Sequence, residues 1–160
     1  HHRPGWNIVG VDLSRDALSV AEDNAIRLGK IVGVTWVASD LFAALPKQRF
    51  DLITANPPYI PSAEVLRLQP TILEYEPRIA LEGGIDGLSV ARRIIEQAPD
   101  WLTTGGALAI EIGYDQGPVV ASLFQQASFS DVTIHKDYGS RHRVVSGLFT
   151  SNVNSTNEHT

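Results

Sequence analysis

The chain has 160 residues, of which 43% are hydrophobic and 19% are charged, and its formal net charge is −5. These values are ordinary for one globular domain, and they give no broad basic surface that would make nucleic acid the default partner. Cysteine is absent, which excludes disulfides and thiolate metal sites, and no apolar run is long enough to cross a membrane. We therefore expect a soluble, cytoplasmic protein. The five histidines show no ligand spacing, so no metal is expected.

The amino terminus is unusual for a natural chain. It begins with His1 and His2, and the sequence contains no methionine. A natural chain begins with methionine or with a small residue exposed by its removal, so we expect a fragment of a longer protein. The two histidines are either a tag remnant or native loop residues.

Two strands, each associated with an acid, open the chain. The segment Asn7–Asp12 is an apolar strand that ends in an acid, and Gly33–Ala38 is a second strand that is followed by Asp40. Between them, Ser14 is a suitable N-cap for a helix that Gly29 ends. The sequence therefore predicts a strand, a helix and a strand in this order.

The middle of the chain is organised around one strand and the corner that follows it. Leu41–Leu45 predicts a helical turn, and the apolar run Phe50–Ala55 predicts a strand buried inside a parallel sheet. The polar corner Asn56–Tyr59 follows, at the strand end where open α/β sheets bind ligands. Pro61–Gly87 is long and irregular, which indicates either a functional or a mobile segment.

The last third of the chain continues the alternation of helices and strands. The predicted elements are a helix from Leu88 that ends at Pro99, a strand at Gly106–Ile112, a helix with Pro118 in its first turn, and an antiparallel pair at Asp131–Asp137 and Arg143–Phe149. The pattern predicts an α/β fold, with a doubly wound, mostly parallel sheet and an antiparallel edge. Residues 1–150 form the expected domain, and 151–160 a disordered tail.

The corner suits the recognition of a planar NH₂ group. An amide or aromatic amine nitrogen is a poor nucleophile, so a site that modifies it must fix its plane and accept its N–H groups. Asn56 offers a side-chain carbonyl, while Pro57 and Pro58 are rigid and lack N–H groups. Tyr59 adds a ring that could stack on the amide or base. The alternative, from these residues alone, is a turn that simply ends a strand.

The two acids at the strand ends suggest a nucleotide-like ligand. In α/β sheets of this kind, an acid at the end of the second strand commonly binds the two ribose hydroxyls, and Asp12 stands at such an end. Asp40 could accept from an adenine amino group. Each could instead be a helix-start or turn aspartate.

Six segments of the sequence together resemble one family. They are V-D-L-S at 11–14, S-D-L-F at 39–42, N-P-P-Y-I-P at 56–61, Y-E-P-R-I-A-L-E-G-G-I-D-G-L at 75–88, E-I-G-Y-D-Q-G at 111–117 and R-H-R-V-V-S-G at 141–147. In this order they resemble the peptide chain release factor glutamine methyltransferases, the HemK-type family. The tetrapeptide N-P-P-Y alone is shared with DNA adenine and ribosomal protein glutamine methyltransferases, and the surrounding segments narrow the resemblance.

The resemblance implies a Rossmann-like class I fold and an enzyme that uses S-adenosylmethionine. It further implies methylation of the glutamine side-chain nitrogen in the Gly-Gly-Gln motif of peptide chain release factors, with no direct nucleic-acid partner. Asp12 matches the ribose-binding acid, and Asp40 and Leu41 match positions beside the adenine. Asn56 matches the residue that touches cofactor and substrate. Pro57 and Tyr59 match residues that accept from the glutamine amide and pack on it, and Pro58 lies between them.

The chain departs from the family pattern in one respect. The family has a glycine-rich loop after a first strand, and no G-x-G-x-G occurs here. In this fold the first strand lies between the strand that ends at Asp12 and the strand that ends at Ala55. Its absence implies a gap in the sheet, so we expect these 160 residues alone to bind the cofactor weakly and to be a poor catalyst.

Three alternatives remain open on the sequence. The substrate could be a ribosomal protein glutamine, or the N6 nitrogen of adenine in DNA, although DNA binding would favour a basic groove. The chain could also be a catalytically incompetent cofactor-binding fragment, which the missing glycine loop favours.

Overall fold

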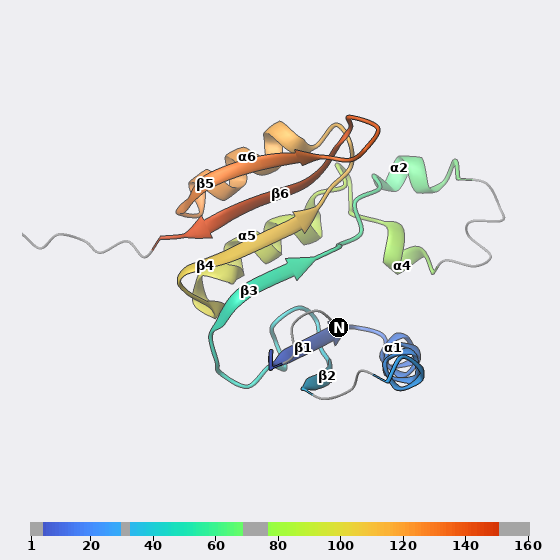
Figure 1. The fold of residues 1–160 in the computed structure, drawn as a ribbon. Coiled ribbons are helices and arrows are strands. Elements are labelled where there is room, and N and C mark those ends of the chain that lie inside the picture. Colours follow the sequence, from blue (N-terminus) through green and yellow to red (C-terminus); the bar gives the residue numbers. More distant parts are fainter. Residues whose placement is uncertain (1–4, 30–32, 69–76, 151–160) are drawn as a thin grey trace, which may run out of the picture. The chain divides into compact units, whose positions relative to one another are not determined.

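The computed structural model describes residues 5–29, 33–68 and 77–150. The chain forms two compact units, His1–Gln48 and Arg49–Thr160, each with its own sheet (Figure 1). In chain order the elements are β1 (Ile8–Asp12), α1 (Arg15–Arg27), β2 (Val34–Ala38), β3 (Phe50–Ala55), α2 (Ser62–Val65), α4 (Arg78–Leu81), α5 (Ser89–Trp101), β4 (Leu102–Glu111), α6 (Gly117–Gln126), β5 (Phe129–Lys136) and β6 (His142–Phe149).

The first unit is built from β1, α1 and β2, as the sequence predicts. The two strands are parallel, with Ile8 opposite Val34 and Asp12 opposite Ala38. The predicted N-cap of α1 is confirmed, since the Ala17 N–H donates to the Ser14 hydroxyl at 3.2 Å. No residue of α1 is buried, so this unit has little core of its own.

The predicted helical turn after β2 is a pair of hydrogen-bonded turns. The Ala43 N–H donates to the Asp40 carbonyl at 3.2 Å, and the Leu45 N–H donates to the Phe42 carbonyl at 3.1 Å. The buried Ser39 stabilises these turns, because its hydroxyl accepts a hydrogen bond from the Ala44 N–H at 2.9 Å.

The second unit contains a mixed sheet with the strand order β3-β4-β6-β5. Strands β3 and β4 are parallel, whereas β6 is antiparallel to both β4 and β5. The predicted antiparallel edge is therefore confirmed. Within the described residues no strand pairs with the second edge of β1 or with that of β3.

The core of the second unit consists of apolar side chains from α2, α5, α6 and the sheet, together with Ile112, which follows β4. Its largest fully buried members are Phe124, Leu102, Leu108, Ile110, Ile112, Val65, Val120 and Val145. The buried face of α5 comprises Ala91, Ile94, Ile95 and Ala98, and α6 begins with Pro118 in its first turn as predicted. The sheet and these two helices therefore support the end of β4 and the loop that follows it.

The predicted end of α5 at Pro99 is wrong, because the helix continues to Trp101. A proline removes one backbone hydrogen bond of the helix and crowds the carbonyl group four residues earlier, but the residues that follow it can keep the helical backbone. The Arg49 guanidinium donates to the carbonyls of Pro99 and Leu102 at 3.3 and 2.6 Å. These bonds satisfy carbonyl groups at the helix end, where α5 runs two residues past Pro99.

The predicted burial of Phe50–Ala55 is also wrong. None of the six residues of β3 is buried, and Leu52 is 43% exposed. The strand is at the edge of its sheet, because β4 is the only described strand that pairs with it. An apolar sequence indicates that a strand favours burial, but whether it is buried depends on the strands and helices that pack against it.

In its described part, the long irregular segment contains the two short helices α2 and α4, and an isolated parallel bridge pairs Ile60 with Glu82. Residues 69–76 and the predicted tail 151–160 lie outside the described residues, and so do His1 and His2. Among the helices that the structure describes, none is long and apolar enough to cross a membrane.

Candidate functional site

The corner Asn56–Tyr59 follows β3 directly, with no regular secondary structure of its own. Asn56 is exposed, Pro57 is buried, and Pro58 and Tyr59 are half-buried. Within the described residues, neither the Asn56 side chain nor the Pro57 carbonyl has a hydrogen-bond partner. Because the sheet and the loops do not use these two acceptors, they are available to a bound N–H group.

The chain beyond the corner is held by backbone hydrogen bonds to the segment around Gly83. The Ile60 N–H donates to the Leu81 carbonyl at 3.0 Å, and the Ile60 carbonyl accepts from the Gly83 N–H at 2.8 Å. The Ser62 N–H donates to the Gly84 carbonyl at 2.9 Å. The loop Gly83–Gly87 is therefore a structural neighbour of the corner. Nothing in the sequence indicated that these two segments lie together.

Two glycines allow this loop to approach the corner closely. A Cβ atom on Gly83 would lie 2.6 Å from the Pro58 carbonyl oxygen, and one on Gly87 would collide with the Tyr59 carbonyl oxygen. Gly87 also has a φ of +75°, which side chains rarely adopt. The glycines are thus required by backbone-to-backbone packing.

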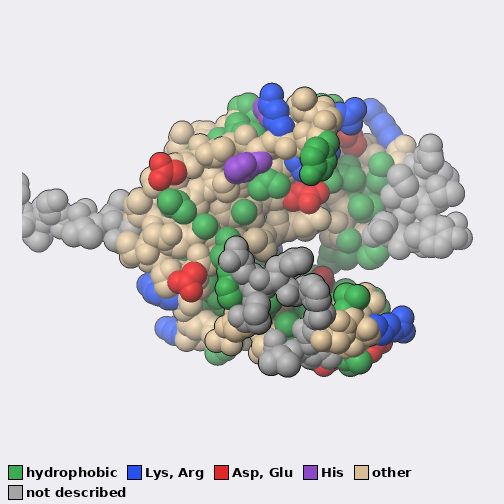
Figure 2. Space-filling model, viewed as in Figure 1, with side chains coloured by type: hydrophobic (Ala, Val, Ile, Leu, Met, Phe, Trp, Pro, Cys, Tyr) green, Lys and Arg blue, Asp and Glu red, His purple; other side chains and the backbone are tan. Residues whose placement is uncertain are grey.

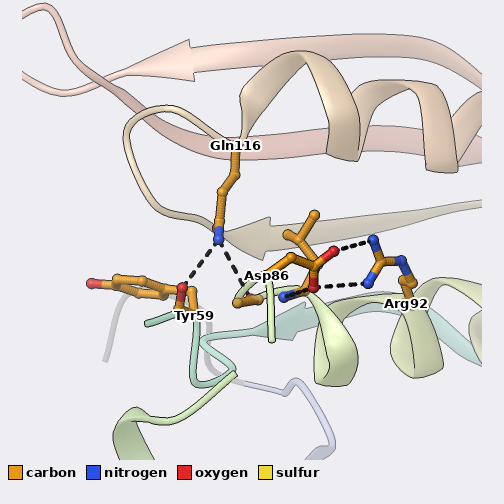
Figure 3. A network of polar contacts seen from close by, with 6 residues as sticks. Tyr59, Asp86, Arg92 and Gln116 are labelled. Atoms are coloured by element: carbon orange, nitrogen blue, oxygen red, sulfur yellow. Dashed lines mark hydrogen bonds and ion pairs between the residues drawn. The ribbon is translucent and has the colours of Figure 1, made fainter. Parts of the chain in front are cut away.

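The same loop is fixed to α5 by an ion pair between Asp86 and Arg92. The guanidinium donates to both carboxylate oxygens, at 3.0 and 2.6 Å, and the Leu88 N–H donates to the same carboxylate at 3.1 Å (Figure 3). The hydrogen bonds from Arg92 are the main cause that lowers the pKa of Asp86 from its ordinary 3.8 to about 2. The loop therefore carries an ionised carboxylate down to unusually low pH.

Replacing Arg92 by glutamine should raise the pKa of Asp86 toward 3.8. A carboxyl group whose pKa is lowered in the folded state stabilises the fold above its unfolded pKa, so the contribution of Asp86 is lost as pH falls from about 4 to about 2. NMR titration of the Asp86 side-chain carbonyl carbon measures the midpoint directly. Arg67→Gln removes an equal charge elsewhere and should leave the midpoint at about 2. An unchanged midpoint in Arg92→Gln would contradict this assignment.

Asp12 and Asp40 lie at the same edge of the β1–β2 sheet. Because β1 and β2 are parallel and Asp12 is opposite Ala38, the carboxyl ends of both strands meet there. Both acids are exposed. One Asp12 carboxylate oxygen accepts from the Ser14 N–H at 2.8 Å. Asp12 therefore also has the turn-forming role that the sequence left open as an alternative to ligand binding.

Leu41 has a backbone conformation that the sequence did not reveal. Its φ is +52°, which is rare for a residue with a γ-branched side chain. The half-buried side chain follows Asp40 directly. Non-glycine residues in this region often occur at binding sites, where the surrounding structure holds them in place.

The structure thus brings the predicted residues together in two groups. Asp12, Asp40 and Leu41 belong to the first unit, and the corner Asn56–Tyr59 belongs to the second. A buried residue that sequence reasoning did not single out, Gln116, contacts the corner (Figure 3). The only indication of this residue in the sequence was its place in the segment E-I-G-Y-D-Q-G at 111–117. No group of three potential metal ligands occurs among the described residues.

Comparison with known proteins relates the chain to one group of enzymes. It is 44% identical over 144 residues to a release factor glutamine methyltransferase of Geobacter sulfurreducens, covering 90% of this chain and 50% of the relative. The corresponding protein of Caulobacter vibrioides is 39% identical over 146 residues, covering 91% and 50%. The chain therefore spans about half the length of the curated relatives it matches. No family model matches.

Solved structures show the fold. A methyltransferase from Pyrococcus furiosus superimposes with a TM-score of 0.64 at 16% identity, covering 90% of this chain and 63% of that chain. A Streptococcus mutans structure in complex with SAH superimposes with a TM-score of 0.58 at 15% identity, covering 89% and 75%. The chain has the α/β fold of the class I methyltransferases, as predicted.

Proposed function

We propose that this chain, a homologue of the release factor glutamine methyltransferases, carries the acceptor side of a site that methylates a glutamine side-chain amide. The substrate would be the Gly-Gly-Gln motif of peptide chain release factors in the cytoplasm. The observation that carries the proposal is the pair of unused acceptors in the corner, the Asn56 side chain and the Pro57 carbonyl. Identity of about 40% to enzymes named for this reaction supports it.

The corner performs this chemistry by orientation. A primary amide has two N–H groups in one plane, and two oxygen acceptors fix both that plane and the direction of the nitrogen. Asn56 and Pro57 provide these acceptors, and the half-buried ring of Tyr59 packs on the amide plane. Methyl transfer would form an N–C bond while the bond from the methyl group to the donor's sulfur breaks and its electron pair stays on the sulfur. Positive charge would develop on the nitrogen, so the same oxygens bind the transition state more tightly than the ground state. The amide then releases one proton to solvent.

The cofactor implied is S-adenosylmethionine, which supplies an electrophilic methyl group on a sulfonium. The residues of the first unit fit its adenosine part. Asp12 has a second carboxylate oxygen beyond the one that Ser14 uses, and an exposed carboxylate can accept from both ribose hydroxyls. Asp40 and Leu41 are placed at the same strand edge, where Asp40 could accept from the adenine amino group and Leu41 could pack beside the ring.

Asp12→Ala should weaken the binding of S-adenosylmethionine by about 10- to 100-fold, which corresponds to about 1.4–2.8 kcal/mol in total, because in this exposed site water partly replaces the hydrogen bonds that the carboxylate makes. Isothermal titration calorimetry of the full natural chain that carries this sequence measures the effect. Asp16→Ala, in the first turn of α1, removes an equal charge and should change the affinity little. Equal affinities of the two variants would remove Asp12 from the cofactor site.

DNA and ribosomal protein remain the competing substrates. On the face seen in Figure 2, Lys and Arg side chains of the described residues are scattered and form no broad basic patch, and the net charge is −5. Both observations favour a protein substrate over DNA, whose binding depends on many phosphate contacts.

A methyl-transfer assay separates these possibilities. The full natural chain is supplied with labelled cofactor and with a release factor, the same factor with its Gly-Gly-Gln glutamine changed to alanine, ribosomal protein, or DNA. We expect label only in the unmodified release factor. Label in ribosomal protein or DNA would replace the proposed substrate, and label in none would support a catalytically incompetent, cofactor-binding protein.

A further inference from the structure

Gln116 is a buried polar side chain at the start of α6. It is 9% exposed, and it lies in the loop between β4 and α6. Burying an amide costs free energy unless its donors and acceptor are satisfied. The partners of this side chain therefore indicate what it does.

The amide of Gln116 joins three segments that are distant in the sequence. Its Nε2 donates to the Tyr59 carbonyl at 3.0 Å and to the Gly87 carbonyl at 3.4 Å, across 57 and 29 residues of sequence. Its Oε1 accepts from the Gly113 N–H at 2.9 Å. Figure 3 shows the side chain pointing from the loop above toward Tyr59 and the segment at Asp86. A single side chain thus connects the corner, the glycine loop and the end of β4.

The packing around this amide is tight. A Cβ atom on Gly87 would lie 2.7 Å from the Gln116 Nε2, and one on Gly113 would lie 3.1 Å from its Oε1. A side chain at Gly87 would therefore displace the Gln116 amide, and one at Gly113 would press against it. The two glycines and the glutamine form one arrangement that holds the Tyr59 carbonyl in place.

Tyr59 connects Gln116 to the proposed substrate site, because it belongs to the corner and accepts the Gln116 hydrogen bond. Its backbone carbonyl is bound by Gln116, and the chain on its other side is the rigid Pro57-Pro58 pair. Fixing the carbonyl fixes the peptide plane after Tyr59, and with it the backbone from which the ring projects. We propose that Gln116 is a positioning residue, which orients the corner for binding a planar amide. This inference rests on the proposed function.

Two variants separate this role from a structural role at the start of α6. Gln116→Met has a similar shape but no polar atoms, so it removes all three hydrogen bonds. Gln116→Glu keeps the acceptor for the Gly113 N–H and, when ionised, lacks the donor for the Tyr59 carbonyl. When the glutamic acid is protonated, its O–H can donate again, and burial raises its pKa toward the neutral range. Gln126→Leu, which removes an exposed bond to Ser122 in α6, is the matched control.

The experiment measures methyl transfer to the release factor by the full natural chain, per folded protein and well below each melting temperature. For Gln116→Met we expect kcat to fall about 10- to 100-fold, since small misplacements of reacting groups have effects of this size, with little change in KM for the cofactor. For Gln116→Glu we expect a similar loss near pH 9 and partial recovery as pH is lowered toward about 6. Gln126→Leu should match the unmodified protein.

Two results would overturn the proposal. The first is a Gln116→Glu variant as active as the unmodified protein at all pH values, which would leave only the structural bond to Gly113. The second is an unchanged kcat in Gln116→Met. If the unmodified protein transfers no methyl group, the proposed function fails, and amide hydrogen exchange at Ile60 and Gly83 still decides the positioning role. Faster exchange in Gln116→Met than in Gln126→Leu supports it, and equal exchange contradicts it.

Discussion

Asn56→Ala is expected to lower kcat for methyl transfer by about 100- to 1000-fold, the effect of removing one group that stabilises developing charge in a transition state. The exposed side chain of Asn56 has no partner within the described part of the chain. Its removal therefore breaks no hydrogen bond among the described residues, and stability should change little. The measurement is a single-turnover rate with release factor and saturating cofactor, together with the melting temperature.

Asn24→Ala is a matched control, because Asn24 is an exposed residue of α1 and its substitution removes the same atoms. This variant should transfer methyl groups at the unmodified rate. A rate for Asn56→Ala within about threefold of the control, which corresponds to less than 1 kcal/mol in the barrier, would exclude the corner from the active site.

Gly87→Ala is expected to lower the free energy of unfolding by about 2–5 kcal/mol. The added Cβ imposes a left-handed backbone on a side-chain residue, at about 1–2 kcal/mol, and it meets the Tyr59 carbonyl, an overpacking cost of about 1–3 kcal/mol. The close approach to Tyr59 and to Gln116 is the feature tested. Denaturant unfolding of the full natural chain gives the value.

Gly105→Ala isolates the steric part of this effect. Gly105 has a similar φ of +82°, but a Cβ atom added there would meet nothing within 4 Å. This variant should lose only the backbone contribution of about 1–2 kcal/mol. Equal losses at Gly87 and Gly105 would mean that the loop does not pack on the corner as described.

Local sequence patterns predicted the elements of this fold well. Ser14 caps α1 and Gly29, with a φ of +62°, follows its end, because caps depend on a few adjacent residues. The corner after β3 could also be predicted from the sequence, because consecutive prolines restrict the backbone regardless of the surrounding structure. The sequence placed an acid at or just after the end of each of the first two strands. Because β1 and β2 are parallel, both acids lie at the same end of their sheet.

Contacts between distant segments could not be predicted in this way. The extension of α5 past Pro99 depends on Arg49, which is fifty residues away in the sequence. The bond of Gln116 to Tyr59 likewise depends on how three loops meet. The exposure of β3 reflects its position at the edge of its sheet, which no pattern within the strand reports.

The most direct test of the account is to locate the transferred methyl group by tandem mass spectrometry of a release factor after reaction with the full natural chain. We expect one methyl group on the side-chain nitrogen of the Gly-Gly-Gln glutamine, formed by the unmodified protein and by Asn24→Ala but barely by Asn56→Ala. A methyl group on any other residue, or equal modification by Asn56→Ala, would contradict the assignment of the corner as the site that holds a glutamine amide.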